Sequence, residues 1–242
     1  MLLTAPFTVV GNGPVLGPAC GGPPTIDGTF GPGEWDQADY ESFTIRGDHD
    51  GDIYVMNDLN NLYICVRIFD NETYAYDAVS LFFDNDNDGV REAGDDGLII
   101  SITTAFLDRY YDGTNIQTDS QKDGAGNRGI DLAYVWTYEF AHPLCSGDTG
   151  HDFCLTSGDT VGFTLMWTDQ DELGTFSDYW PASFASPGEW GDIEIAECES
   201  TPAEPVGGDV FPIDKLAMLT PYILVALAIV TATSILIKKR RN

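Results

Sequence analysis

Apolar and polar residues alternate with a period of two in several parts of this chain. The segment 61–70, NLYICVRIFD, places an apolar residue at every second position from Leu62 to Ile68, and the segments 131–141 and 161–169 repeat the pattern. Such alternation is typical of a β-strand with one buried face. Further strands are expected at 53–56, 78–83, 98–106 and 192–196. Because no long amphipathic helical pattern occurs between them, we expect an all-β fold in which antiparallel sheets pack as a sandwich.

The chain of 242 residues is long enough for one well-buried domain with appended segments. Residues 1–20 form a Gly/Pro-rich lead, and one interpretation makes this lead the remnant of a signal peptide. Residues 21–199 carry the strand patterns and are expected to form the sandwich. Residues 200–213 are rich in Pro, Gly and Glu and are expected to be a linker, because they are too polar to pack a core.

The C-terminal part has the pattern of a membrane anchor. Residues 216–237 contain no charged side chain, and as a helix they would be roughly 33 Å long, enough to cross the hydrocarbon core of a bilayer. The basic sequence KKRRN follows at once, and the positive-inside rule places such a cluster in the cytoplasm. We therefore expect a single-pass transmembrane helix at 214–237, a cytoplasmic tail at 238–242 and an extracellular sandwich domain at the cell membrane.

The charge of the chain excludes some functions. Asp and Glu number 39 against 11 Lys and Arg, for a net charge of −28. A surface of this kind repels nucleic acid and attracts cations. No activated-serine motif or phosphate-binding loop occurs, and the histidines are expected in loops. We therefore expect neither a nucleic-acid partner nor an enzyme.

An extracellular location favours disulfides and glycosylation. Cys145 and Cys154 flank a short loop, while Cys20 and Cys198 bracket the whole expected domain. In an oxidising compartment each pair is expected to form a disulfide. Asn71 begins the sequon Asn-Glu-Thr in an expected surface loop and is a candidate glycosylation site.

A zinc site is the alternative to one of these disulfides. His142, Cys145, His151 and Cys154 form an H-x2-C-x5-H-x2-C array whose ligand types suit zinc. Cys65 lies in a strand pattern and is expected to be buried and free.

The segment 84–97, DNDNDGVREAGDDG, matches a calcium-binding loop, although it lies between two expected strands rather than two helices. Calcium accepts six to eight oxygen ligands in irregular geometry, and Gly89 permits the sharp bend that such a loop requires. The expected ligands are the side chains of Asp84, Asp86, Asp88 and Glu92, the carbonyl of Val90, and a closing carboxylate from Asp95 or Asp96. The alternative is a merely acidic turn on a strongly acidic surface.

Six motifs follow one another in a familiar order: TIDGTFGPGEWDQA, NLYICVRIFDN, DAVSLFFDNDNDG, YEFAHPL, VGFTLMWTD and PGEWGDIEIAE. In this order they resemble the family 9 carbohydrate-binding modules and their DOMON-like relatives over about residues 24–198. The resemblance implies a jelly-roll sandwich, often with structural calcium. The tail FPIDKLAMLTPYI looks like the anchors of archaeal surface proteins.

The resemblance also implies where a sugar would bind. Members of the family that bind sugars hold the ring between two aromatic side chains. Here the first aromatic position corresponds to Tyr74 or Tyr76, just ahead of Asp77, and the second corresponds to Trp180 or Phe184. The family more often has tryptophan at these positions, so Tyr74 and Phe184 depart from its pattern.

Three functions follow as hypotheses. The first is a calcium-stabilised module that binds a glycan or envelope polysaccharide at the cell surface. The second is a structural or adhesive envelope protein without sugar binding. The third, from the DOMON-like relatives, is a haem-binding electron-transfer domain with Met56 or Met166 as a ligand.

Overall fold

The computed structural model of the protein describes residues 13–72, 74, 76–171 and 174–199. The chain divides after Glu199 into two units, and the description covers the first. The expected linker, membrane helix and tail, residues 200–242, lie outside the described residues and stay predictions. No helix within the described ranges is long and apolar enough to span a bilayer.

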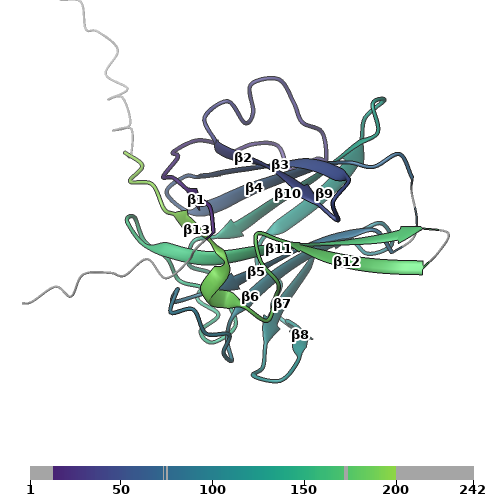
Figure 1. The fold of residues 1–242 in the computed structure, drawn as a ribbon. Coiled ribbons are helices and arrows are strands. Elements are labelled where there is room, and N and C mark those ends of the chain that lie inside the picture. The colour runs from purple at the N-terminus through teal and green to yellow at the C-terminus, as the bar shows by residue number, and fades with distance from the viewer. Residues whose placement is uncertain (1–12, 73, 75, 172–173, 200–242) are drawn as a thin grey trace, which may run out of the picture. The chain divides into compact units, whose positions relative to one another are not determined.

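Two β-sheets face each other and make up the described domain (Figure 1). The eight-stranded sheet has the order β1 (Val15–Leu16), β13 (Gly191–Glu194), β11 (Thr160–Asp171), β5 (Ala78–Asp84), β6 (Asp96–Ser101), β7 (Leu107–Tyr111) and β8 (Ile116–Thr118), and β12 (Gly174–Trp180) also pairs with β11. The five-stranded sheet has the order β2 (Asp39–Ile45), β3 (His49–Asn57), β4 (Asn61–Phe69), β10 (Val135–Pro143) and β9 (Ala125–Ile130). Apart from the 3₁₀ turn η1 (Pro187–Glu189), the described secondary structure is all β, which confirms the predicted sandwich.

The two faces of β4 show how alternation builds the core. Leu62 and the apolar residues that follow it at every second position pack between the two sheets. Tyr63 and Cys65 face the other way, and they are also buried, in a second cluster with Trp35. Apolar residues of the segment 19–38 complete this cluster, so the N-terminal segment covers part of the outer face of the five-stranded sheet.

A buried carboxylate fastens this N-terminal segment to the sheet. The Glu139 side chain, in β10, is fully buried. Its Oε2 accepts the backbone N–H groups of Asp27 at 3.0 Å and Gly28 at 2.7 Å, and its Oε1 accepts the indole N–H of Trp35 at 3.3 Å. Gly28 has φ of 84°, and a Cβ there would collide with the carbonyl of Arg128. Only glycine therefore allows the segment to lie this close to β9.

The strand expected at 131–141 begins later than the alternation predicted. β10 starts at Val135, and Leu132 is fully exposed rather than buried. Oδ1 of Asp131 accepts the backbone N–H of Ala133 at 2.7 Å and of Val135 at 3.1 Å. Tyr134 has φ of 61°. A side chain that binds the nearby backbone in this way forms a turn in place of the sheet ladder, which is why the prediction was wrong here.

The strand expected at 98–106 is interrupted for a similar reason. β6 ends at Ser101, and β7 begins at Leu107. The backbone N–H of Thr104 donates to Oγ of Ser101 at 2.8 Å, and the N–H of Ser101 donates to the Thr104 carbonyl at 3.1 Å. These bonds close a turn, so the single expected strand is two antiparallel strands.

Both expected disulfides are present. Cys20 is bonded to Cys198, and Cys145 is bonded to Cys154. Cys65 is free and buried, as expected. Because Cys145 and Cys154 are bonded to each other, the alternative zinc array that would have used both thiolates is wrong. Its two histidines, however, lie among carboxylates.

Glycosylation of Asn71 stays a prediction. Asn71 is exposed, as glycosylation requires, and Thr73 lies outside the described residues.

Candidate functional site

The acidic segment 84–97 forms the connection between the antiparallel strands β5 and β6. The ligand atoms of Asp84, Asp86 and Asp88 lie within 4.8 Å of one another. The Asp84 carboxylate accepts the N–H of Gly89 at 2.8 Å and of Asp88 at 3.3 Å, and Asp88 accepts that of Val90 at 2.8 Å. Since each carboxylate has about four lone-pair sites, these bonds leave room for a cation. The three carboxylates therefore fit the donor set that calcium prefers.

The two candidates for the closing carboxylate point to different places. Asp95 turns into the loop, where it accepts the backbone N–H of Glu92 at 2.8 Å and of Asn85 at 3.3 Å. Burial raises the pKa of Asp95 to about 7 and of Asp84 to about 6, although the N–H donors lower both. Asp96, in contrast, is buried between the sheets beside His142 and does not join the loop. The expectation that Asp96 could close the loop is corrected by this placement.

Trp180 closes one edge of the sandwich. The residue ends β12 and is half-buried against the core. Its ring stacks on Phe43 of the opposite sheet at 4.9 Å between centroids and lies 6.0 Å from the ring of Phe163. One face of the indole is therefore already covered by protein, which favours a packing role over that of a sugar clamp.

Phe184 is also engaged in packing. Its ring lies 4.5 Å from that of Phe82 in β5 and 6.1 Å from that of Trp190, and the guanidinium of Arg91 lies over it at 4.1 Å. The segment that carries Phe184 is thereby held against the outer face of the eight-stranded sheet.

The two tyrosines lie at the other end of β5. Tyr76 is 63% exposed, while Tyr74 is half-buried and donates its backbone N–H to Asp77 at 2.7 Å. Both tyrosines precede Ala78, the first residue of β5. Phe184 packs instead against Phe82, which lies roughly 13 Å from Ala78 along β5. Of the four predicted aromatic residues, only Tyr76 is largely free for a ligand.

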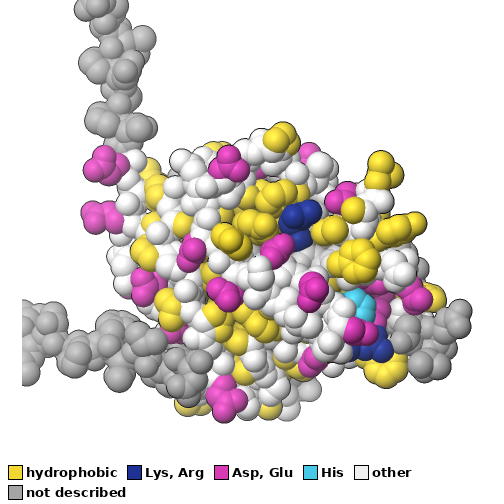
Figure 2. Space-filling model, turned by 45° about the horizontal axis from the view of Figure 1, so that its top comes forward, with side chains coloured by type: hydrophobic (Ala, Val, Ile, Leu, Met, Phe, Trp, Pro, Cys, Tyr) yellow, Lys and Arg dark blue, Asp and Glu magenta, His cyan; other side chains and the backbone are white. Residues whose placement is uncertain are grey.

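The outer face of the five-stranded sheet carries a groove that the sequence motifs did not predict. The groove has a volume of about 490 Å³. It is lined by Ser42, Phe43 and Thr44 of β2, Asp50, Gly51 and Asp52 of β3, Arg67 and Phe69 of β4, and Val135 of β10. In Figure 2, hydrophobic side chains gather beside basic and acidic ones on the face that is turned to the viewer. Polar residues occupy alternate positions of the segment 42–52, on the side of the strands that faces away from the core. This pattern is the sequence signal that could have revealed the groove.

Hydrogen bonds hold the polar side chains of this groove in place. Oγ of Ser42 donates to Asp52 at 2.7 Å, and Oγ1 of Thr44 donates to Asp50 at 3.0 Å. Phe69 is 49% exposed beside them. The groove thus offers one apolar ring face and several ordered polar groups, a combination typical of small-ligand sites.

The packing gives no support to a haem site. Met56 is 1% exposed and lies in the cluster with Trp35, Tyr63 and Cys65, so its sulfur is covered by side chains. Met166 is half-buried in β11, where it faces Ser80 of β5 and Tyr179 of β12 rather than a histidine.

Replacement of Trp180 by alanine is predicted to destabilise the domain. The lost contacts with Phe43 and Phe163 should lower the free energy of unfolding by about 2 kcal/mol, at the low end for core truncations because the side chain is half-buried. Urea unfolding would measure the change. Tyr76→Ala is the control and should alter stability by less than about 0.5 kcal/mol. Equal, small effects of both substitutions would contradict the packing role.

Comparison with known proteins identifies the fold. No family model and no curated protein matches the sequence. Among solved structures, a family 9 carbohydrate-binding module from Caldicellulosiruptor kristjanssonii in complex with cellotriose has a TM-score of 0.55 and 16% identity, covering 80% of this chain and 99% of that one. A family 9 module from the same organism in complex with glucose has a TM-score of 0.50 and 17% identity, covering 77% of this chain and 98% of that one. The described domain therefore has the β-sandwich fold of these modules.

Proposed function

We propose that this protein is a non-catalytic module that binds carbohydrate. The observation that carries the proposal is the groove, because it combines an exposed aromatic ring with ordered polar groups on a sandwich with the fold of carbohydrate-binding modules. Its volume of about 490 Å³ lies within the usual range for small-molecule sites.

The chemistry of the groove suits a sugar ring. The face of Phe69 can stack on the apolar face of a sugar. Asp50 and Asp52 can accept hydrogen bonds from hydroxyl groups, and the Arg67 guanidinium can donate to hydroxyl or ring oxygens. Arg67 is already oriented, since it lies 4.4 Å from the ring centroid of Phe30. Tyr134, which precedes Val135, is 54% exposed and adds a second ring near the same end of the groove.

Removal of the aromatic ring from the groove is predicted to weaken glycan binding. Phe69→Ala should reduce the affinity of the full-length protein for cello-oligosaccharides about tenfold, which corresponds to about 1.4 kcal/mol of lost stacking and burial. Affinity electrophoresis followed by calorimetry would measure the loss. Because Phe69 is half exposed, this substitution is expected to leave the fold intact.

The variant Tyr76→Ala distinguishes carbohydrate binding in the groove from binding at the aromatic position that the resemblance implied. If the groove is the site, Tyr76→Ala leaves affinity unchanged. A loss with Tyr76→Ala and none with Phe69→Ala would move the site to the start of β5. Failure of the wild-type protein to bind any carbohydrate in a broad screen would favour the structural or adhesive alternative.

We also propose that the segment 84–97 binds calcium. The convergence of Asp84, Asp86 and Asp88 supports this proposal, as does the inward turn of Asp95. When bound, calcium would offset the mutual repulsion of these carboxylates and so stabilise the connection between β5 and β6.

Calcium is predicted to stabilise the protein in a pH-dependent way. At free calcium a hundredfold above the dissociation constant, the stability should increase by about 2.7 kcal/mol, observed as a higher melting temperature that EDTA reverses. Protons compete for the same carboxylates. The affinity should therefore be greatest above about pH 7 and fall as the pH drops through the pKa values of Asp95, about 7, and Asp84, about 6.

Two variants make this test specific. Asp84→Asn combined with Asp88→Asn should abolish most of the calcium-dependent shift. Asp112→Asn, in an exposed turn outside the loop, should preserve it. A melting temperature that is indifferent to calcium and EDTA would leave the segment an acidic turn.

We further propose that the domain is displayed outside the cell on a single C-terminal membrane helix. The uncharged residues 216–237 and the KKRRN that follows support this topology, and the two disulfides suit an oxidising compartment. Protease added to intact cells should digest the sandwich domain, as detected with an antibody to it. Protection of the domain until the cells are lysed would contradict the topology.

A further inference from the structure

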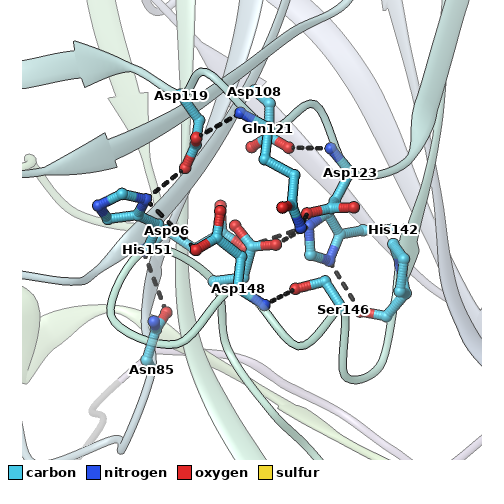
Figure 3. Close-up of polar contacts among 12 residues, drawn as sticks. Asn85, Asp96, Asp108, Asp119, Gln121, Asp123, His142, Ser146, Asp148 and His151 are labelled. Carbon is cyan, nitrogen blue, oxygen red and sulfur yellow. Dashed lines mark hydrogen bonds and ion pairs between the residues drawn. The ribbon is translucent and has the colours of Figure 1, made fainter.

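Four polar side chains meet between the two sheets, away from the groove. Asp96 begins β6 and Asp108 lies in β7, while His142 is near the end of β10 on the opposite sheet (Figure 3). Asp152 comes from the loop after β10. Their exposed fractions range from 1% to 8%, and their ligand atoms all lie within 4.8 Å of one another. The group therefore joins both sheets and one loop inside the protein.

These side chains have too few hydrogen-bond partners for their burial. Both carboxylate oxygens of Asp96 and of Asp152, Oδ1 of Asp108 and Nε2 of His142 meet no hydrogen-bond partner among the described residues. Buried polar atoms are normally paired, and an unpaired buried carboxylate is costly. Burial raises the pKa of Asp96 well above its usual range. When the three carboxyl groups are ionised, their charge exceeds that of one imidazole, and a bound cation would offset the excess.

The imidazole is oriented as a metal ligand would be. Nδ1 of His142 lies 2.8 Å from the carbonyl oxygen of Pro143. Because a carbonyl oxygen only accepts, Nδ1 carries a proton, and in the neutral ring the lone pair is on Nε2. Nε2 faces the carboxylates of Asp96 and Asp152, and its lone pair is available to an ion once the ring is neutral. A backbone carbonyl behind the ring is a common partner of metal-bound histidines.

The distances between these side chains also suit ligands around one shared ion. Nε2 of His142 lies 3.7 Å from Oδ2 of Asp96 and 3.6 Å from Oδ2 of Asp152. Both distances exceed those of hydrogen bonds. Two ligands bonded to one tetrahedral zinc ion are roughly 3.3–3.6 Å apart, given metal–ligand bonds of about 2.0–2.2 Å. A small adjustment of side chains would complete such a site.

We propose that Asp96, Asp108, Asp152 and Nε2 of His142 bind one divalent transition-metal ion of the zinc type. Calcium and magnesium prefer oxygen ligands alone, whereas zinc accepts imidazole together with carboxylates. Because four protein ligands enclose the position and all are buried, the ion has a structural role. It fastens β6 and β7 to β10 and secures the loop that the Cys145–Cys154 disulfide also closes.

A second group of two aspartates and a histidine lies nearby and provides a control, because it is less buried. Asp119, Asp148 and His151 also lie within 4.8 Å of one another, and Asp148 and His151 are only partly buried. Nδ1 of His151 is 2.8 Å from Asp119, and its ring stacks on Tyr110 at 3.8 Å. The His151 imidazole lies at ion-pair distance from a carboxylate and is 35% exposed, so water can reach it, whereas the His142 centre is closed to water.

Zinc itself is the probe for the test. The full-length protein, stripped with a chelator and then given Zn²⁺, should retain a zinc ion by mass spectrometry and melt at a higher temperature. His142→Gln and Asp108→Asn should each lower zinc affinity by more than about a hundredfold, since even partners of ligands account for ten- to a hundredfold. His151→Gln, and Asp84→Asn combined with Asp88→Asn, should leave zinc affinity unchanged.

A measurement on the wild type covers the case in which the variants fail to fold. Zinc K-edge X-ray absorption should show nitrogen and oxygen ligands with imidazole scattering and no sulfur. The proposal would be overturned if the stripped wild type took up no zinc, or if its spectrum lacked imidazole. Zinc binding that His151→Gln removes and His142→Gln does not would also overturn it, as would calcium uptake at the centre in preference to zinc.

Discussion

Buried carboxylates constrain this structure strongly, because many acidic side chains lie inside the described domain. Each buried carboxylate must find donors or a positive charge. Glu139 meets this requirement with three N–H groups of the N-terminal segment, and Asp77 with the backbone N–H groups of Tyr74 and Gln170. Asp169 pairs with Arg46. In each case at least one polar bond joins segments that are distant in sequence, so charge compensation also helps to determine which segments pack together.

Asp96 and Asp152, whose carboxylate oxygens meet no such donor among the described residues, lie beside His142. Asp84 and Asp95 form an intermediate case, since backbone N–H groups satisfy them only in part and burial still raises their pKa values. The peptide bond between Asp95 and Asp96 separates the two environments. Adjacent residues of a strand point to opposite sides, so Asp95 turns into the loop while Asp96 faces the interior. A single strand end thus supports two proposed ion sites of different chemistry.

Asn57 ties the beginning and the end of the domain together. Its backbone N–H donates to Ala19 at 2.9 Å, and its carbonyl accepts the N–H of Gly21 at 3.0 Å. Its side chain exchanges two bonds with the backbone of Ala196, of 2.8 Å and 3.2 Å. The Cys20–Cys198 disulfide lies beside these contacts. The sandwich is therefore closed just before the segment that is expected to lead to the membrane, and the groove lies on the same closed unit.

Patterns in the sequence predicted the sandwich, the Cys145–Cys154 disulfide and the acidic connection between β5 and β6, because alternation, close cysteine spacing and loop composition all act over short stretches. The Cys20–Cys198 disulfide spans 178 residues and was predicted instead from the position of its cysteines at the two ends of the domain. Side-chain turns at Asp131 and Ser101 were missed because a hydrogen bond to the backbone overrides apolar alternation. Only the tertiary structure decided that Trp180 packs on Phe43, that the groove forms across four strands, and that His142 meets carboxylates from the facing sheet. These arrangements depend on strand register and on how the sheets are stacked, which bring together residues that no local spacing relates.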